Sequence, residues 1–349
     1  MVIYHNVCRA GCVSIQKLPF QVNYDLAIIM PLDEEVLYTT VMGTQLLKKG
    51  EIEILNVKDP VKIETIGDRG RIAFVSFDRT FTDTIFDQME FNIYNCSNTN
   101  FFGAKACPED LGKLKKMFVD FMTACMEERD IPAIEAGAKS IVDIICLRFN
   151  IVDEIFNTKS RKDDYNGKER FRKINEYIFT HISEKIALSD LAAHTYLSTP
   201  YLSREFSAKM EQTYSNIINL YRTLNAGIQL LETDDSLTYI ANNSGFSSTK
   251  YYHTYFEKYY GCPPAKFRSN NKNKEMQIEE EELQASELQR FLTAEESISS
   301  IFNRHIVDFE EEDSFEQIEI MNDSDERKGY VIKMVLGPKE KIILKKEKL

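Results

Sequence analysis

The sequence has no tryptophan, and its 349 residues include only five histidines and seven cysteines. His5 is the only histidine before His181, and no two cysteines form a Cys-x-x-Cys pair. A metal centre needs several His, Cys or carboxylate ligands close together. The chain also shows no nucleophile beside a base and no paired carboxylates of the kind used in catalysis. We therefore expect no metal site, no cofactor and no enzymatic activity.

Long apolar runs are also missing. None reaches the ~18 residues of a membrane span, and the N-terminus lacks the basic and apolar pattern of a secretion signal. The cysteines are odd in number and scattered, which is typical of free thiols in a reducing compartment. The sequence therefore predicts a soluble cytoplasmic protein. A redox pair formed by Cys8 and Cys12 is the alternative to ordinary buried thiols.

Negative charge is unevenly distributed along the chain. The net charge is −12, which by itself argues against a nucleic-acid partner. Residues 170–274 nevertheless carry thirteen Lys and Arg against nine Asp and Glu, whereas residues 275–313 carry two Arg against thirteen Asp and Glu. Because local charge decides the attraction to phosphates, the middle of the chain is compatible with nucleic-acid binding.

Residues 186–206 have the pattern of a helix-turn-helix unit. Ser198 is a suitable N-cap, and Pro200 falls in the first helical turn, where its missing N–H costs nothing. Leu202 and Phe206 are four residues apart and therefore share the buried face of the second helix. Small polar and cationic side chains that can reach base edges occupy the outward positions, namely Thr199, Ser203 and Arg204.

The same pattern recurs fifty positions later in the chain. Gly245 supplies the turn, where a positive φ costs little, and Ser247 or Ser248 caps the second helix. Tyr252 and Phe256 form the buried pair at i and i+4. The candidate DNA contacts of this unit are Thr249, Lys250, His253, Thr254 and Lys258.

One long helix is predicted between the two units, at residues 214–231. At about 1.5 Å per residue it spans roughly 27 Å. A rigid spacer of this length suits two recognition helices that enter successive major grooves on one face of DNA.

These motifs resemble the DNA-binding domain of the AraC/XylS family of transcription regulators. The matching segments are 188–193, 198–206, Arg222 with Ala226, 230–234, 240–241, 244–246, Phe256 and 261–268. Three departures from the family pattern occur, at Thr195-Tyr196 in place of a turn glycine, at Gln229 in a usually apolar place, and at Glu257 where Lys is common. The resemblance implies double-stranded DNA and RNA polymerase as partners, and activation more often than repression.

Residues 1–102 predict short β-strands. The β-branched or aromatic segments lie at 24–30, 36–41, 51–56, 61–65 and 71–77. Their spacing predicts a small antiparallel barrel, and residues 48–56 resemble a turn of the cupin-type sensor domain that precedes the DNA-binding domain in the AraC family. The resemblance implies a small-molecule effector, such as a sugar. Aromatic side chains that can stack on it are Tyr24, Tyr38 and Phe74, with core packing as the alternative for each.

Two helices follow at residues 111–129 and 134–152, with a break at Pro132. Their apolar stripes either cover the open side of the barrel or, as the resemblance implies, pair two subunits in a homodimer. The polar segment 157–169 predicts an interdomain linker.

Members of the family usually end near the position of Arg268, so the resemblance says nothing about the acidic segment after residue 273. Residues 283–292 predict a helix, and residues 329–344 predict two strands around Gly337-Pro338. Three interpretations remain open for this extension: a solvated tail, a fragment of a further β-rich domain, or an acidic arm that competes with phosphates for the recognition helices.

The sequence thus predicts an α+β multidomain protein. Residues 1–156 form a cupin-like sensing and pairing domain, 157–169 a linker, 170–272 an all-α domain with two helix-turn-helix motifs, and 273–349 an acidic extension of unknown fold. The predicted function is sequence-specific DNA binding and transcription regulation in response to a small molecule. The alternatives are an interaction protein with a degenerate helix-turn-helix domain and a cupin-type enzyme with an accessory helical domain.

Overall fold

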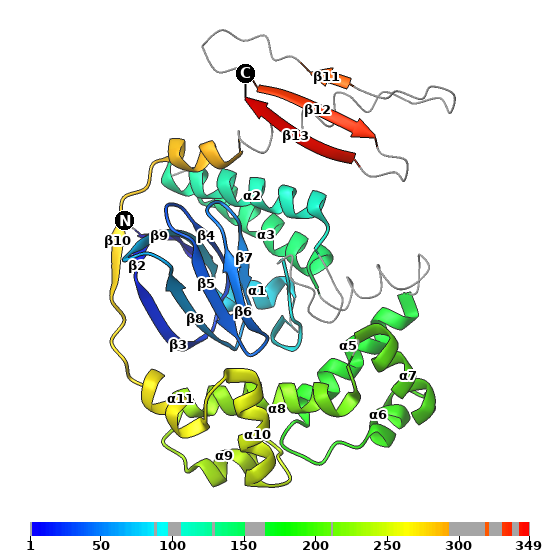
Figure 1. Cartoon of the computed structure of the whole chain (residues 1–349). Helices are drawn as coiled ribbons and strands as arrows, with labels where there is room; N and C mark the ends of the chain where they lie inside the picture. The colour runs from blue at the N-terminus through cyan, green and yellow to red at the C-terminus, as the bar shows by residue number, and fades with distance from the viewer. Residues whose placement is uncertain are drawn as a thin grey trace, which may run out of the picture. The chain divides into compact units, whose positions relative to one another are not determined.

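The computed structural model describes residues 2–86, 89–96, 106–127, 130–150, 165–210, 212–292, 318–320, 330–336 and 342–348. The chain divides into two compact units, Met1–Leu292 and Thr293–Leu349. The first unit contains antiparallel sheets followed by a run of helices (Figure 1). Residues 157–164 of the predicted linker lie outside the described residues, and helix α5 (Tyr165–Thr180) begins within its last part.

Two antiparallel sheets form the N-terminal part. The first sheet contains, in spatial order, β1 (Val2–Tyr4), β2 (Cys8–Ile15), β9 (Gly70–Phe77), β4 (Leu26–Pro31) and β7 (Glu53–Leu55), and β10 (Ile278–Glu281) also pairs with β2. The second contains β3 (Lys17–Asn23), β8 (Asp59–Thr65), β5 (Val36–Thr40) and β6 (Gly43–Leu47). The predicted antiparallel β fold is therefore confirmed, as two sheets.

Strand β4 shows how the layers are arranged. All six of its residues are buried, because alternate side chains point to opposite faces of the sheet and both faces are covered. Ala27 and Ile29 join a core shared with the second sheet. Ile28 and Met30 join a core shared with helices α2 (Pro108–Met126) and α3 (Ile131–Arg148). The first sheet is thus covered on one face by the second sheet and on the other by two helices, as Figure 1 shows.

The apolar stripes of α2 and α3 pack inside the chain. Phe118 and Phe121 of α2 and Ile141 and Ile145 of α3 are buried in the core beneath the first sheet. The apolar stripes of α2 and α3 therefore cover one face of the first sheet. Leu147 of α3, in contrast, lies 69% exposed.

Within residues 1–102, the strands β1, β2, β3 and β6 were not predicted from the sequence. Strand β6 alternates exposed and half-buried residues and carries Thr44 and Gln45, so it lacks an apolar run. Strand β3 contains Pro19 and an irregular register between Leu18 and Gln21. Proline inside an apolar run argues against a strand at the sequence level, and here the irregular pairing accommodates it.

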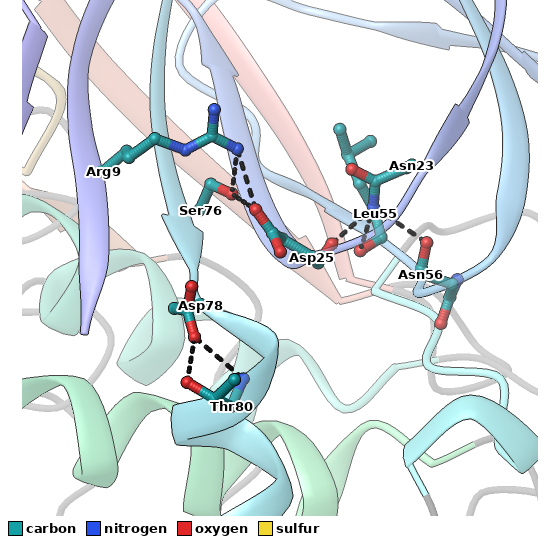
Figure 2. Close-up of polar contacts among 8 residues, drawn as sticks. All are labelled: Arg9, Asn23, Asp25, Leu55, Asn56, Ser76, Asp78 and Thr80. Atoms are coloured by element: carbon teal, nitrogen blue, oxygen red, sulfur yellow. Dashed lines mark hydrogen bonds and ion pairs between the residues drawn. The ribbon is translucent and has the colours of Figure 1, made fainter. Parts of the chain in front are cut away.

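A polar network fixes the turn between β7 and β8. The side-chain amide of Asn23 donates to the carbonyl oxygens of Asp25, Leu55 and Asn56 (Figure 2). The backbone N–H of Lys58 donates to the Asn23 carbonyl at 2.7 Å, and Lys58 adopts a left-handed φ of 56°. Beside this turn, Asp25 accepts from both Arg9 and Ser76 at 2.8 and 3.0 Å. The start of β8 is therefore held in a defined position.

Residues 278–292, which we call the return segment, belong to the N-terminal core. Strand β10 pairs with β2 over four residues, and Glu279 forms an ion pair with Arg69 at 2.7 Å. Residues 285–292 are helical, as the sequence predicted. Leu288 is fully buried in the same core as α2. The interpretation as a solvated tail is wrong for these residues, because strand pairing and apolar burial hold them.

The second unit contains one antiparallel sheet. Its strands are β11 (Ile318–Ile320), β12 (Tyr330–Leu336) and β13 (Ile342–Lys348). The two strands predicted around Gly337-Pro338 are confirmed as β12 and β13.

The remaining helices follow α5 in sequence, and two shorter helices lie after β9. Their bounds are α1 (Arg79–Ile85), η1 (Met89–Phe91), α6 (Leu188–His194), α7 (Thr199–Met210), α8 (Tyr214–Glu232), α9 (Leu237–Asn243), α10 (Thr249–Tyr260) and α11 (Pro264–Asn271). Among the described residues, no helix is both long and apolar enough to cross a membrane.

The helical region contacts the second sheet through an aromatic cluster. The ring of Phe20 on β3 lies 5.4 Å from Tyr260 of α10 and 4.9 Å from Phe267 of α11, between ring centroids. The Phe20 N–H donates to the Asn271 side chain at 3.0 Å. Within Met1–Leu292 the sheets and the helices therefore share a packed interface.

We predict that Leu288→Ala destabilises the first unit. Removing a fully buried leucine leaves a cavity and should lower the free energy of unfolding by about 2–5 kcal/mol in urea titrations. Leu46→Ala is the matched control, because Leu46 is 45% exposed and should change stability by less than about 0.5 kcal/mol. If Leu288→Ala changed the free energy of unfolding as little as Leu46→Ala, the return segment would not be part of the core.

Candidate nucleic-acid interface

The first helix-turn-helix unit consists of α6 and α7. The Asp190 carboxylate accepts the Ala187 N–H at 3.0 Å, and the Ser198 hydroxyl accepts the Tyr201 N–H at 3.4 Å. These contacts satisfy N–H groups that a helix start leaves without partners. Leu202 and Phe206 are buried on the inner face of α7, as predicted. Both helices therefore have defined N-terminal ends, and α7 is fixed by its apolar face.

The turn between α6 and α7 lacks a glycine. Tyr196 adopts a φ of 56°, a left-handed conformation that side chains other than glycine rarely take. The Thr195 hydroxyl donates to the Leu191 carbonyl at 2.7 Å, and the Tyr196 side chain is 95% exposed. The positive φ of Tyr196 therefore places local strain in the backbone of this turn. The exposed ring itself displaces no packed neighbour.

The second unit consists of α9 and α10. Ser236 and Ser248 cap these helices by accepting the N–H groups of Tyr239 and Tyr251 at 3.2 and 3.3 Å. Tyr252 and Phe256 are fully buried, so the predicted i, i+4 pair is confirmed by the packing. The two units therefore use the same construction.

Gly245 forms the turn of the second unit because no side chain fits there. Its φ is +81°, and a Cβ at this position would lie 2.1 Å from the Ile182 carbonyl oxygen and 2.8 Å from Nε of Arg222. Arg222 also donates from Nη2 to the Glu184 carbonyl at 2.9 Å. The turn is thus packed against α8 and the segment that follows α5.

Gln229 is buried at a position where an apolar residue was expected. Its amide nitrogen donates to the Ser244 hydroxyl at 3.0 Å, and its amide oxygen accepts from Asn243 at 2.9 Å. Because both ends of the amide are hydrogen-bonded, burial costs little. Gln229 therefore ties α8 to the C-terminal end of α9.

The candidate contact residues fall into two groups by exposure. Most of them are exposed to solvent, whereas Thr249 and His253 are half-buried, with the His253 ring 5.4 Å from that of Tyr252. The exposed residues are Thr199, Ser203, Arg204, Lys250, Thr254 and Lys258. Within the described part of the chain no ion pair engages Arg204, Lys250 or Lys258. Their charges are available to an external anion.

Tyr251 was not predicted as a contact residue. It lies between Lys250 and Tyr252 on α10 and is 58% exposed. Sequence reasoning treats aromatic residues as core, and only the helical phase of its neighbours Tyr252 and Phe256 marks Tyr251 as outward. An exposed tyrosine beside a cation can contact sugar or phosphate.

The predicted effector-binding aromatics are not brought together. Tyr38 is buried and lines a cavity of about 210 Å³. Phe74 packs against the core between the sheets, and Tyr24 is 50% exposed. Two acidic residues that line the same cavity as Tyr38, Glu53 and Asp59, were not considered as ligand-binding residues. The sequence feature that could have identified them is an acidic residue inside or next to an otherwise apolar β segment.

We predict that Gly245→Ala destabilises the helical region. The new Cβ would collide with backbone at a positive φ, so the free energy of unfolding should fall by more than about 1 kcal/mol, measured by urea unfolding. Gly112→Ala in α2 is the control, since a Cβ there meets nothing within 4 Å and should stabilise by about 0.5–1 kcal/mol. If Gly245→Ala left the free energy of unfolding unchanged, the Ile182 carbonyl would have to move aside without cost.

Comparison with known proteins locates the similarity in this region. A protein-family model described as a helix-turn-helix domain matches residues 191–270. Regulatory protein PocR of Salmonella typhimurium is 33% identical over 99 residues, which is 28% of this chain and 33% of PocR. An uncharacterised HTH-type transcriptional regulator of Staphylococcus aureus is 20% identical over 224 residues, 63% of this chain and 28% of that protein. The chain thus spans about a third or less of the length of these relatives.

Among solved structures, ToxT from Vibrio cholerae O395 aligns with 12% identity and a TM-score of 0.41, covering 76% of this chain and 99% of ToxT. The family match at 191–270 coincides with the two capped helix pairs and the helix between them. Residues 191–270 therefore form a helix-turn-helix domain of the AraC type.

Proposed function

We propose that this protein is a sequence-specific DNA-binding transcription regulator whose N-terminal part responds to a small molecule. Helices α7 and α10 enter the major groove of double-stranded DNA. Arg204 and Ser203 of α7, and Lys250 and Thr254 of α10, contact base edges or phosphates. The family resemblance adds activation as the sign of regulation, RNA polymerase as a partner, and a sugar as one class of effector.

One observation carries the proposal. Two helices of twelve residues each have the same buried i, i+4 pair and the same exposed polar and cationic face. The intervening helix α8 has nineteen residues and so measures about 28 Å at 1.5 Å per residue. Contacts of α8 with both α7 and α10 make it a rigid spacer. Such a spacing fits two recognition helices about one helical turn of DNA apart.

The position of the cavity supports a small-molecule response. Its walls come from β5, β7 and β8 on one side and from α5 and α8 on the other. A molecule bound there contacts the sheets and the spacer helix of the DNA-binding region together. Binding can therefore change how α8 presents the recognition helices.

We also propose a homodimer that uses the outer surface of α2 and α3. The inner surface of both helices is already buried against the first sheet. The exposed apolar side chains Ile131 and Leu147, 56% and 69% exposed, lie on α3 and are available to a second subunit.

The direct test is selection of DNA sites from a random library with the purified chain. The proposal requires a bipartite motif with its halves about one helical turn apart. Selection is repeated with Thr293–Leu349 removed, which leaves the return segment in place. A site recovered only from the shortened chain would make the second unit inhibitory. Failure to enrich any site at low salt in both cases would reject DNA binding and favour an interaction protein.

We predict that Arg204→Ala relaxes specificity at one base position. An exposed arginine on a recognition helix makes its strongest contact with guanine, so the loss should be about 1–3 kcal/mol at that base and small elsewhere. Binding to a panel of single-base variants of the selected site measures this. Lys49→Ala, an exposed cation on the turn after β6, is the control and should bind like the wild type. An unchanged base preference in Arg204→Ala would contradict the assignment.

We predict a different result for Lys258→Ala. The Lys258 Nζ lies 5.0 Å from the ring centroid of Tyr259 near the C-terminal end of α10, so this cation is placed to contact phosphate rather than a base. Affinity should fall by a similar factor for all sequences, and the slope of log K against log salt should decrease by about 1. A loss confined to one base position would instead make Lys258 a base contact.

A further inference from the structure

The cavity lined by Tyr38 contains two buried carboxyl groups. Asp59 at the start of β8 is 9% exposed, and Glu53 at the start of β7 is 4% exposed. The cavity measures about 210 Å³, whereas a single water needs roughly 10–15 Å³ of such space. It is therefore large enough for a small organic molecule.

Asp59 lacks the partners that a buried carboxylate needs. Its Oδ1 atom is inaccessible to solvent and has no hydrogen-bond partner in the described structure. Glu53 is better satisfied, because its Oε1 accepts the Ile54 N–H at 3.0 Å and the Cys96 thiol at 3.4 Å, and the Cys96 backbone N–H also donates to this carboxylate. Buried carboxylates are normally paired with a cation or with several donors. Asp59 therefore has acceptor capacity in excess of the donors around it.

Among the described residues that line the cavity, none supplies a free positive charge. Lys58 is the cation among the described lining residues, and its Nζ is bound to the Glu90 carboxylate at 2.7 Å. Glu90 also accepts from Arg79 at 2.7 Å, so this cluster balances its own charge. The other titratable groups near Asp59 are the hydroxyls of Tyr38 and Tyr260, which are neutral. Neither Glu53 nor Asp59 is therefore paired with a cation among the described residues of the cavity wall.

The environment of this pair favours the neutral acid while the cavity holds no cation. Desolvation by burial raises the pKa of Asp59 to about 7, and the same cause raises the pKa of Glu53 to about 7 against the hydrogen bonds that it accepts. Burial, and after it the proximity of Asp59 and Glu53, raises the pKa of Tyr38. All three residues line the same cavity.

We propose that this cavity binds a small organic cation, a primary amine with an apolar body, whose ammonium group is held by Asp59 and Glu53. The inference deepens the proposed response to a small molecule and rests on that proposal for its regulatory meaning. An ammonium has three donors and no acceptor, which matches the two acidic side chains that line the cavity. Its charge also offsets the cost of ionising the two acids in a buried site.

The remainder of the cavity fits the apolar body. The side chains that form it are mostly aliphatic or aromatic, and they come from both the sheets and the helices: Ile54, Val57, Ile93, Phe179, Leu224 and Ile228. A sugar carries hydroxyl groups around its whole ring, and those that face these apolar side chains would have no partners. Polar partners are offered by other lining residues, namely Thr40, Gln45, Asn56, Asn92, Asn95 and Asn225. A primary amine places its single polar group near Asp59 and Glu53, and the rest of the molecule contacts the apolar side chains.

Occupation of the site connects the two parts of the first unit. Leu224 and Ile228 lie on α8, and Phe179 lies on α5, whereas both acids lie at the starts of strands. A molecule held by its ammonium group at β7 and β8 therefore fixes the distance from the sheets to the spacer helix. This contact makes amine binding and DNA binding mutually dependent.

The test is isothermal titration of the full chain, without DNA, with n-hexylamine, n-hexanol and hexanoate as probes of equal length. Hexylamine should bind at least tenfold more tightly than either of the others. Equal binding of hexanol, or preferential binding of hexanoate, would overturn the proposal. A titration with a monosaccharide such as arabinose is included, and tighter binding of the sugar would also overturn it.

Two isosteric variants locate the site. Asp59→Asn and Glu53→Gln should each weaken hexylamine binding at least tenfold while leaving hexanol binding unchanged. Asp68→Asn is the matched control, since Asp68 lies exposed in the turn after β8 and should bind hexylamine like the wild type. Far-UV circular dichroism confirms that the variants are folded. Undiminished hexylamine binding in both cavity variants would place the cation elsewhere.

The pH dependence separates a bound cation from a bound neutral donor. Binding of an ammonium requires ionised carboxylates, so affinity is retained above pH 7 and lost as the pH falls through about 7. For one group with this pKa, the dissociation constant should be about tenfold larger at pH 6 than at pH 8. Constant affinity across this range would contradict the proposal. Because these titrations contain no DNA, they remain decisive even if the site selection finds no operator.

Discussion

The packing of helix α8 is the constraint on which the rest of the first unit depends. Its nineteen residues contact α7 and α9 to α11 as well as strands β3 and β8. Tyr221, Ala226 and Leu230 are buried along it. Gly227 admits the Tyr260 ring, because a Cβ there would lie 2.5 Å from the tyrosine oxygen. A helix held from so many directions moves as a rigid body, and both recognition helices move with it.

The return segment makes the N-terminal part continuous with residues beyond the DNA-binding region. Strand β10 extends the edge of the first sheet beside β1, and Leu288 and Leu292 complete the core under it. Phe291 occupies the space that Gly50 leaves open. The chain thus leaves the sheets, forms the helix-turn-helix region and returns. Both ends of the helical region are thereby connected to the same β core, in addition to the contacts made by Phe20.

Polar groups are buried in two different ways in this protein. Gln229 is buried with hydrogen-bond partners at both ends of its amide, and it strengthens the contact between α8 and α9. Asp59 is buried with one oxygen lacking a partner, beside a cavity. The first arrangement is typical of a structural role and the second of a site that a ligand completes. The same physical cost, desolvation, thus distinguishes the scaffold from the candidate effector site.

The sequence by itself determined the local features. Local chemistry at helical or strand spacing is enough to predict the buried i, i+4 pairs, such as Tyr252 with Phe256, and the helix caps. It also predicts the length of α8 and the strands that have continuous apolar patterns. The tertiary structure alone decided which distant segments meet. Nothing local shows that Ile278–Glu281 pairs with Cys12–Ile15, or that Glu53, Asp59 and Tyr38 converge with α8 on one cavity. Strand pairing and cavities depend on contacts between residues far apart in the chain, and local periodicity carries no information about those contacts.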